Sequence, residues 1–394
     1  MMMRIVIATL LGSALLQAPP PLGGLCRLNE HCLPGGASRL AALLLPQILP
    51  VLPPHRANHA RRGPRFSVVA PCHPGAALRN PVLVQPTQAT RPGVKSPGVR
   101  IPIERLTPEA VFPVPGKPDW IAVDEDVWIS NAPKDTVARL DPRANTVVAT
   151  IAVGKRPCSG LVAAFGSLWV PNCGDQDVTR LDLKTSAVTA TIRAGIGNSE
   201  GSIVAGAGSI WMTTDAKGTL ARFDPATNAV VAEIYVARGS YGLAFGEDAV
   251  WVTSTDNNTV TRVDPQTNLV VETIPVGKAP RFIAAGAGAV WSLNQGDGSV
   301  SRIDPKTNKV VATIEVGVPG PGGDIAVGEG SVWVTSFEFP LSRIDPATNA
   351  VVQQFAGKGG DAVRVGLGSV WLSNLEAGNV WRIDPRRVEA TLPE

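Results

Sequence analysis

Short stretches in which apolar and polar residues alternate recur along the last three quarters of the chain. The stretch that begins at Arg302 reads "RIDPKTNKVVATIEV", and near-copies begin at Arg262 and Arg343. Its alternating apolar positions are Val310, Ala312, Ile314 and Val316. A period of two residues is that of a β-strand with one buried face. The pattern therefore predicts a strand in every copy.

Each copy contains enough signals for four short strands. In the unit that begins near Asp324, the apolar run "DIAVG" passes through the turn "GEGS" into "VWVTS", which predicts a hairpin. A third strand, "LSRID", is followed by "DPATN", in which Pro presets φ and Asp and Asn accept turn geometry. The alternating stretch then supplies the fourth strand.

Two ladders of residues set the number of copies. R-x-D signatures begin at Arg139, Arg180, Arg222, Arg262, Arg302, Arg343 and Arg382, and Pro follows the Asp in all but the second, where Leu183 stands. Tryptophans run in step at Trp128, Trp169, Trp211, Trp251, Trp291, Trp333 and Trp371. Four strands in roughly 40 residues, repeated in series, indicate a β-propeller. The fold class is therefore all-β, a seven-bladed propeller of four-stranded blades over residues 109–394. We interpret the repeated Arg and Trp mainly as packing within and between blades, with Arg and Asp pairing with each other or across a blade boundary.

The ring needs a closing strand, and either end of the chain can supply it. The segment Ala110–Trp120 resembles Glu272–Phe282, which makes it a candidate fourth strand for the last blade. The C-terminal "VEATLPE" competes for the same place. The sequence leaves this choice open.

The N-terminal region differs from the repeats in charge and composition. Residues 1–108 hold 12 Lys and Arg against 2 Asp and Glu, and the remainder holds 24 against 31. Arg4 followed by a short apolar run predicts a signal peptide over residues 1–18, and no apolar run is long enough to span a bilayer. Residues 19–108 are rich in Pro and Arg without periodicity and predict a disordered linker. An alternative is a start codon placed too far upstream.

These features predict a periplasmic or secreted protein, expected to be a monomer. The mildly acidic repeat region argues against nucleic-acid binding, because phosphate contacts need clustered Lys and Arg. The expected partner is an unknown small molecule, peptide or envelope protein.

Candidate binding residues come from the loops that gather around the channel on one face of a propeller. Two groups of residues fall there, one before the tryptophans and one three positions after them. They are Asp119, Glu200, Tyr241, Arg281, Asp324 and Asp361 on the first loops, and Asn131, Asn172, Asn294 and Asn374 on the second. Such side chains can line a polar funnel. The alternative for the Asn residues is that they end the second strand and cap its turn.

The repeats lack the residues of common catalytic sites. All four His residues lie upstream of residue 109, which removes Ser-His-Asp, Cys-His and His-ligated metal chemistry from the ring. No catalytic residue, metal ligand or cofactor is predicted. Cys158 and Cys173 flank the predicted hairpin of the second blade and are a candidate disulfide.

The motifs resemble known propeller families. "WVTS" joined to "RIDPxTN" resembles the YVTN-type repeats of bacterial envelope proteins, and the "G-x-x-W" form resembles the virginiamycin B lyase (streptogramin lyase) family. The lyase resemblance implies a His general base before the Trp and acidic magnesium ligands after it. The matching base positions here are Asp119, Ser159, Gly201, Tyr241, Arg281, Gly323 and Asp361, and Asn, Thr or Ser occupy the ligand positions.

Two functions follow as hypotheses. The first is an exported cell-envelope propeller that binds a ligand or partner on its loop face without catalysis. The alternative is a carbon-oxygen lyase of the virginiamycin B lyase type with Asp119, Asp361 or Glu200 in place of His. The alternative needs two of these carboxylates within about 4–6 Å of each other, one of them with a raised pKa. A third possibility is a structural scaffold, expected if side chains plug the channel.

Overall fold

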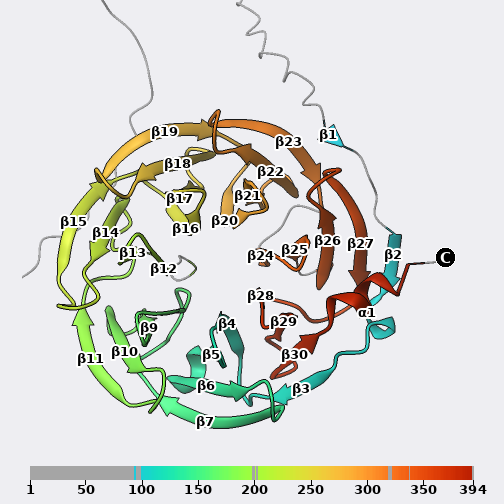
Figure 1. Cartoon of the computed structure of the whole chain (residues 1–394), viewed down its shortest axis with the longest axis horizontal. Coiled ribbons are helices and arrows are strands. Elements are labelled where there is room, and N and C mark those ends of the chain that lie inside the picture. The colour runs from blue at the N-terminus through green and yellow to red at the C-terminus, as the bar shows by residue number, and fades with distance from the viewer. Residues whose placement is uncertain are drawn as a thin grey trace, which may run out of the picture. The chain divides into compact units, whose positions relative to one another are not determined.

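Seven β-sheets stand around a central axis in the computed structural model, which describes residues 93–94, 99–197, 200, 203–317, 322–336 and 338–392 (Figure 1). Each sheet is one blade, and its strands follow one another from the axis to the rim. The predicted fold class, a seven-bladed all-β propeller, is confirmed. The predicted signal peptide and most of the predicted linker lie outside the described residues.

The strands of the first three blades, from axis to rim, come in chain order. Blade one has β4 (Pro118–Val123), β5 (Val127–Asn131), β6 (Thr136–Asp141) and β7 (Thr146–Ala152). Blade two has β8 (Val162–Ala164), β9 (Ser167–Asn172), β10 (Asp177–Asp182) and β11 (Val188–Arg193). Blade three has β12 (Ile203–Gly206), β13 (Ser209–Thr213), β14 (Thr219–Phe223) and β15 (Val230–Tyr235).

The next three blades repeat this order, and two of them gain a fifth strand. Blade four has β16 (Ser240–Gly246), β17 (Ala249–Ser254), β18 (Thr259–Asp264) and β19 (Leu269–Pro275). Blade five has β20 (Pro280–Gly286), β21 (Ala289–Asn294), β22 (Ser299–Asp304), β23 (Lys309–Glu315) and, outside them, β1 (Gly93–Val94). Blade six has β24 (Asp324–Gly328), β25 (Ser331–Thr335), β26 (Leu341–Asp345), β27 (Ala350–Ala356) and, outside them, β2 (Val99–Pro102).

Blade seven joins the two ends of the propeller. It has β28 (Val363–Gly366), β29 (Ser369–Asn374) and β30 (Asn379–Ile383), and β3 (Ala110–Pro113) is its outer strand. Three short helices complete the described structure: η1 (Ile103–Arg105), η2 (Ala132–Lys134) and α1 (Pro385–Glu389). No helix in the described ranges is long and apolar enough to cross a membrane.

The seven ladder tryptophans are buried between strands and blades. Each lies in the second strand of its blade and is at most 1% exposed. In most blades the indole Nε1 donates to the backbone carbonyl five residues earlier, as Trp251 does to Gly246 at 3.0 Å. A buried indole N–H needs such a partner. The interpretation of this ladder as packing is confirmed.

The repeated Arg joins each blade to the next. Arg262 Nη1 donates to the carbonyl of Pro305 at 2.7 Å and to Asn308 Oδ1 at 2.8 Å, both in the following blade. The guanidinium of Arg262 also lies 5.2 Å from the ring centroid of Trp251. We call this set of contacts the latch. The same pattern joins Arg180 to Pro225 and Asn228, Arg222 to Pro265 and Asn268, Arg302 to Pro346 and Asn349, and Arg382 to Pro142 and Asn145.

The repeated Asp has a different role from the one we expected. Asp264 Oδ1 accepts the backbone N–H of Gln266 at 2.8 Å and so closes the turn. The backbone N–H groups of the turn hold the pKa of such carboxyls below the ordinary value. The expected pairing of Arg with Asp is therefore wrong for this motif. The Asn of the repeated turn is the partner of the Arg instead. It takes a left-handed conformation, with φ 55° at Asn308, and its side-chain oxygen accepts from the Arg of the preceding blade.

The N-terminal segment closes the ring. Strand β3 pairs antiparallel with β30, with Val111 opposite Trp381 and Phe112 opposite Val380. The C-terminal candidate instead forms α1, whose Val388 is fully buried. Because blade seven lacks the repeated turn, the Arg of blade six takes other partners, and Arg343 pairs with Glu389 at 2.8 Å.

Ordered structure also reaches upstream of the boundary at residue 109. Strand β2 pairs parallel with β27, and the side chains of Ile101, Ile103 and Leu106 are buried against blades six and seven. Residues 99–108, which we placed in the linker, thus belong to the propeller wall.

Candidate functional site

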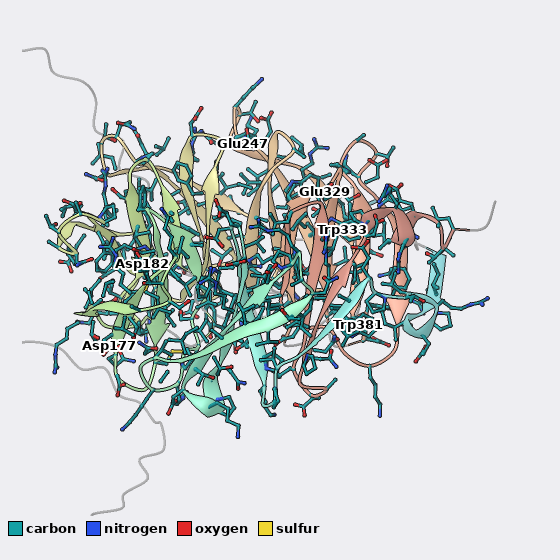
Figure 2. All side chains as sticks on the ribbon, turned by 60° about the horizontal axis from the view of Figure 1, so that its bottom comes forward. Asp177, Asp182, Glu247, Glu329, Trp333 and Trp381 are labelled. Carbon is teal, nitrogen blue, oxygen red and sulfur yellow. A yellow bond between two sulfur atoms is a disulfide. The ribbon has the colours of Figure 1, made fainter. Side chains whose placement is uncertain are left out.

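The inner strands begin on one face of the ring, and we call the residues around the channel there the mouth. Asp177, at the start of β10, lies on the same face as the mouth. Figure 2 shows Glu247 and Glu329, in the turns where inner strands end, on the opposite face. The mouth residues come from the starts of six inner strands or the loops just before them. They are Asp119 and Trp120, Glu200, Tyr241, Arg281 and Phe282, Asp324, and Asp361 with Arg364.

Two aromatic side chains meet across the channel directly beneath these groups. Trp120 of blade one and Phe282 of blade five have ring centroids 5.8 Å apart in an edge-on arrangement. Both side chains are at most 4% exposed, and Trp120 Nε1 donates to the carbonyl of Cys158 at 3.0 Å. The mouth therefore has an apolar floor.

Two carboxyl groups are in contact at the mouth. The Asp119 and Asp361 side chains are hydrogen-bonded to each other, which requires one of them to carry a proton. Burial raises the pKa of Asp119 well above its ordinary value, and the charges of Asp361 and Glu200 add to this. Burial also raises the pKa of Asp361 to about 6, with further contributions from Asp324 and Glu200. The pair titrates as one unit rather than as two independent acids.

Two ion pairs flank this carboxyl pair. Asp324 is almost fully buried and pairs with Arg364, and its Oδ2 also accepts the backbone N–H of Val363 at 3.1 Å. Burial raises the pKa of Asp324 and Arg364 opposes the rise.

On the other side, Arg281 lies 3.5 Å from a Glu200 carboxyl oxygen. Burial raises the pKa of Glu200, and Arg281 lowers it. The Arg281 guanidinium also stacks on Tyr241, with its carbon 4.9 Å from the ring centroid. The mouth thus has four carboxyl groups against two guanidinium groups, and the surplus negative charge falls on the Asp119–Asp361 pair.

This arrangement can exchange a proton or accept a positive group. In the described ranges, no three or more His, Cys, Asp and Glu side chains are arranged to hold a metal ion.

The four candidate Asn residues are buried in their own blades. Asn131 Oδ1 accepts the Lys117 backbone N–H at 3.1 Å. Asn374 Oδ1 accepts that of Gly360 at 2.9 Å. Asn172 donates to Asp177 and Thr179, and Asn294 donates to Ser299 and Ser301. These contacts tie each Asn to the loop or strand beside it. They agree with the alternative that these residues end the second strand and cap its turn.

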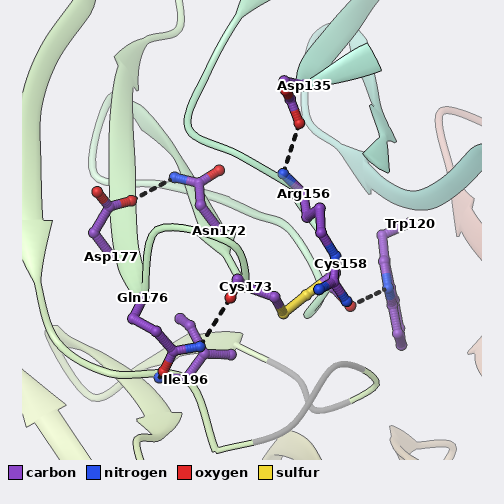
Figure 3. Close-up of a disulfide and its surroundings, with 9 residues drawn as sticks. All are labelled: Trp120, Asp135, Arg156, Cys158, Asn172, Cys173, Gln176, Asp177 and Ile196. Carbon is purple, nitrogen blue, oxygen red and sulfur yellow. Dashed lines mark hydrogen bonds between the residues drawn. A yellow bond between two sulfur atoms is a disulfide. The ribbon is translucent and has the colours of Figure 1, made fainter. Parts of the chain in front are cut away.

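Cys158 and Cys173, the candidate disulfide, are joined across the loop and hairpin of blade two (Figure 3). Their Cα atoms lie 5.9 Å apart, within the usual range for a disulfide. The carbonyl of Cys158 accepts the Trp120 indole N–H, so the disulfide fixes a residue that touches the floor of the mouth.

Sequence reasoning missed three mouth residues: Trp120, Phe282 and Arg364. The positions that match Trp120 and Phe282 in other blades include Gly160, Gly242 and Ala362. A large aromatic residue at a position that is small elsewhere in the repeat was the available signal. The residues that follow Trp120 and Phe282 along the inner strands, together with Arg364, line a cavity of about 340 Å³, whose wall is mainly Ala, Val, Leu and Ile.

Comparisons with known proteins bear on the fold. No family model matches the chain, and no curated protein matches it. Among solved structures, a streptogramin B lyase is 20% identical to this chain, with a TM-score of 0.57. The alignment covers 68% of this chain and 93% of the lyase. The virginiamycin B lyase of Staphylococcus aureus is 16% identical with a TM-score of 0.58, covering 70% of this chain and 98% of the lyase.

A third similar structure is the hydrazine synthase of Kuenenia stuttgartiensis. It is 15% identical with a TM-score of 0.57 and covers 69% of this chain and 96% of that chain. The resemblance to a virginiamycin B lyase-like propeller is confirmed at the level of fold. Because proteins with such different names share this ring, the fold does not select an activity.

Proposed function

We propose that the protein is an exported propeller of the cell envelope that binds a ligand or peptide at the mouth without transforming it. The observation that carries this proposal is the Asp119–Asp361 carboxyl pair beside the aromatic contact of Trp120 and Phe282. We expect a bound group to rest on this aromatic contact, among the carboxyl groups of the mouth.

The charge of the mouth favours a ligand with a cationic or hydrogen-bond-donating group. Glu200 and Asp324 pair with Arg281 and Arg364, whereas the carboxyl pair shares a proton, and Arg281 offsets only part of the rise in the pKa of Asp361. An ammonium or guanidinium group placed there replaces that proton and lowers the pKa of both acids. Binding of such a ligand should therefore release a proton, and it should tighten as the pH rises through the pKa of Asp361, about 6.

Export is supported by the disulfide and by the N-terminal apolar run. Disulfides persist in oxidising compartments and are rare in the cytosol. The Cys158–Cys173 bond thus agrees with a periplasmic or secreted location. The test is cell fractionation of the tagged full chain, and recovery of the reduced protein in the cytosol would contradict this part of the proposal.

Binding is best tested by thermal unfolding of the full chain with a panel of small molecules and peptides. Organic ammonium and guanidinium compounds should be compared with neutral analogues of the same shape, with and without Mg²⁺. A ligand that binds only the folded state at a concentration 100 times its Kd adds about 2.7 kcal/mol of stability. The variants Asp361→Asn and Glu200→Gln should abolish this gain, and Glu315→Gln, at an exposed position on the rim, should retain it. A panel without any charge preference would count against the proposal.

The same carboxyl pair favours one second candidate, the carbon-oxygen lyase. A carboxylate with a raised pKa can act as a base toward a C–H bond beside a carbonyl while the C–O bond breaks. The hydrogen bond between Asp119 and Asp361 and the raised pKa of both groups support this alternative. Incubation with cyclic depsipeptides separates the candidates: linear product that Asp361→Asn fails to form indicates the lyase, and unchanged substrate with retained binding indicates the binding module.

A further inference from the structure

The outer strands of the blades are covered to very different extents. In β27 of blade six, Val351, which lies at the position equivalent to Val270 of β19, is 2% exposed. In β19 of blade four, Leu269, Val270 and Val271 are 64%, 41% and 49% exposed. In blade six, β2 pairs with Gln353–Ala356 of β27, whereas no strand of the described residues pairs with the outer edge of β19. An exposed apolar edge strand is a template for pairing with another strand.

The N-terminal segment covers blades five and six in a repeating register. Ile101 pairs with Phe355 of β27, and Val94 pairs with Ile314 of β23, both in parallel. Phe355 and Ile314 are equivalent, since each lies opposite the residue two positions before the repeated Arg of its blade. The chain therefore advances one blade in seven residues as it runs along the rim (Figure 1).

A groove continues this path upstream of β1. A cavity of about 280 Å³ lies at the rim between blades four and five, lined by Pro275 at the end of β19, by Val276 just after it and by Val310 to Thr313 of β23. Its lining includes Thr313, the partner of Gly93, and Val311, which is 57% exposed. The groove thus joins the edge already paired with β1 to the exposed edge of β19.

We propose that residues 82–90, "VLVQPTQAT", pair in parallel with β19 as a third turn of the same rim strap. A further step of seven residues from Val94 places Thr87 opposite Ile274, which is the equivalent of Ile314. The same register sets the apolar run Val82 to Val84 beside the exposed run Leu269 to Val271. The occupant of this surface is therefore a segment of the chain itself, with main-chain pairing along an open edge and apolar contact on alternate faces.

Hydrogen exchange of the full chain, read at single residues, tests the proposal. The amides of β19 that point away from β18 should exchange at least about tenfold more slowly than the outward amides of β7 and β11, and at rates like those of β27. The variant Leu83→Asp/Val84→Asp should return the β19 amides to fast exchange. The matched variant Leu78→Asp, upstream of the proposed strand, should not.

The remaining outcomes decide against the strap. Fast exchange of β19 in the unmodified chain would overturn it, and so would slow exchange that persists in Leu83→Asp/Val84→Asp. Protection that appears only at high concentration, with a doubled mass in light scattering, would assign the surface to a second copy instead. Slow exchange in the inner strands of the variant shows that the ring itself is intact. The test does not involve the mouth and is independent of the proposed function.

Discussion

Equivalent positions of the repeat hold mostly the same residues at the rim of this propeller and different residues at its mouth. At the rim, five blades use the same Arg, Pro and Asn for the same latch, and the two exceptions occur where the motif changes. Blade two has "DLKTS" in place of the repeated turn, and Arg139 donates instead to the Lys184 carbonyl and to Ser186. At the mouth, equivalent positions hold Asp, Tyr, Arg and Gly. Uniform positions thus hold blades together, and the divergent positions at the mouth give a place where the chemistry differs from blade to blade.

The two regions also respond to pH with opposite signs. Backbone amides lower the pKa of the rim carboxyls, such as Asp264, so the stability they provide is present above the ordinary carboxyl pKa and is lost as the pH falls below it. At the mouth, burial raises the pKa of Asp119 and Asp361, so the folded state binds more protons than the unfolded chain. Stability from this pair is present at low pH and is lost as the pH rises toward and beyond about 6.

The largest expected effect comes from removing a ladder tryptophan. Trp251→Ala deletes a fully buried indole and its hydrogen bond to Gly246, which should lower the free energy of unfolding by about 3–5 kcal/mol. Urea unfolding followed by circular dichroism measures the change. Tyr235→Ala, an exposed aromatic on the outer strand of blade three, is the control and should change stability by less than about 0.5 kcal/mol. Equal losses in both variants would contradict the packing role of the ladder.

A smaller loss of stability should follow removal of the disulfide in blade two, where the turn departs from the repeated motif. Cys158→Ser/Cys173→Ser opens a link with a sequence separation of 15, which in the chain-entropy account costs about 2–3 kcal/mol. The midpoint of urea unfolding should fall, and the unmodified protein under reducing conditions should show the same shift. An unchanged midpoint in both experiments would show that blade two does not depend on the bond.

The latch should contribute about 1–2 kcal/mol at each boundary between blades. Arg262→Ala removes the donor, and Asn308→Gly removes the acceptor while keeping a residue that accepts positive φ. Because the two side chains form one contact, the double variant should lose less stability than the sum of the single variants. Strictly additive losses from this cycle would mean that the contact holds no energy of its own.

The smallest effect is expected at the mouth, and it has the opposite sign. Asp361→Asn removes a carboxyl whose charged form is disfavoured by burial, so the variant should be as stable as or more stable than the parent at pH 7. Between about pH 4 and pH 7, the parent should lose stability relative to the variant. Urea midpoints measured across this range give the difference. Parallel pH curves for the two proteins would show that the carboxyl pair is not protonated in the folded state.

Repetition made the architecture predictable. The ladders at Trp251 and Arg262 and the turn after them gave seven blades of four strands, because identical neighbours must bury identical faces. The partners of the Arg were harder to predict, because the latch depends on which turn of the next blade reaches it. The sequence favoured pairing of each Arg with the Asp two residues later in the same strand. In the structure the Arg instead bonds to the turn of the next blade, as Arg262 does to Pro305.

The choice of closing strand and the grouping at the mouth were decided only by the tertiary structure. Two segments had suitable patterns for closure, and β3 took the place while the C-terminal segment formed α1. Asp119 and Asp361 are 242 positions apart in the chain and touch because blades one and seven are neighbours in a closed ring. The sequence by itself determined the repeated unit, since strand periodicity and turn chemistry are local. The meeting of unlike residues at the axis is set by closure of the circle, which no single repeat encodes.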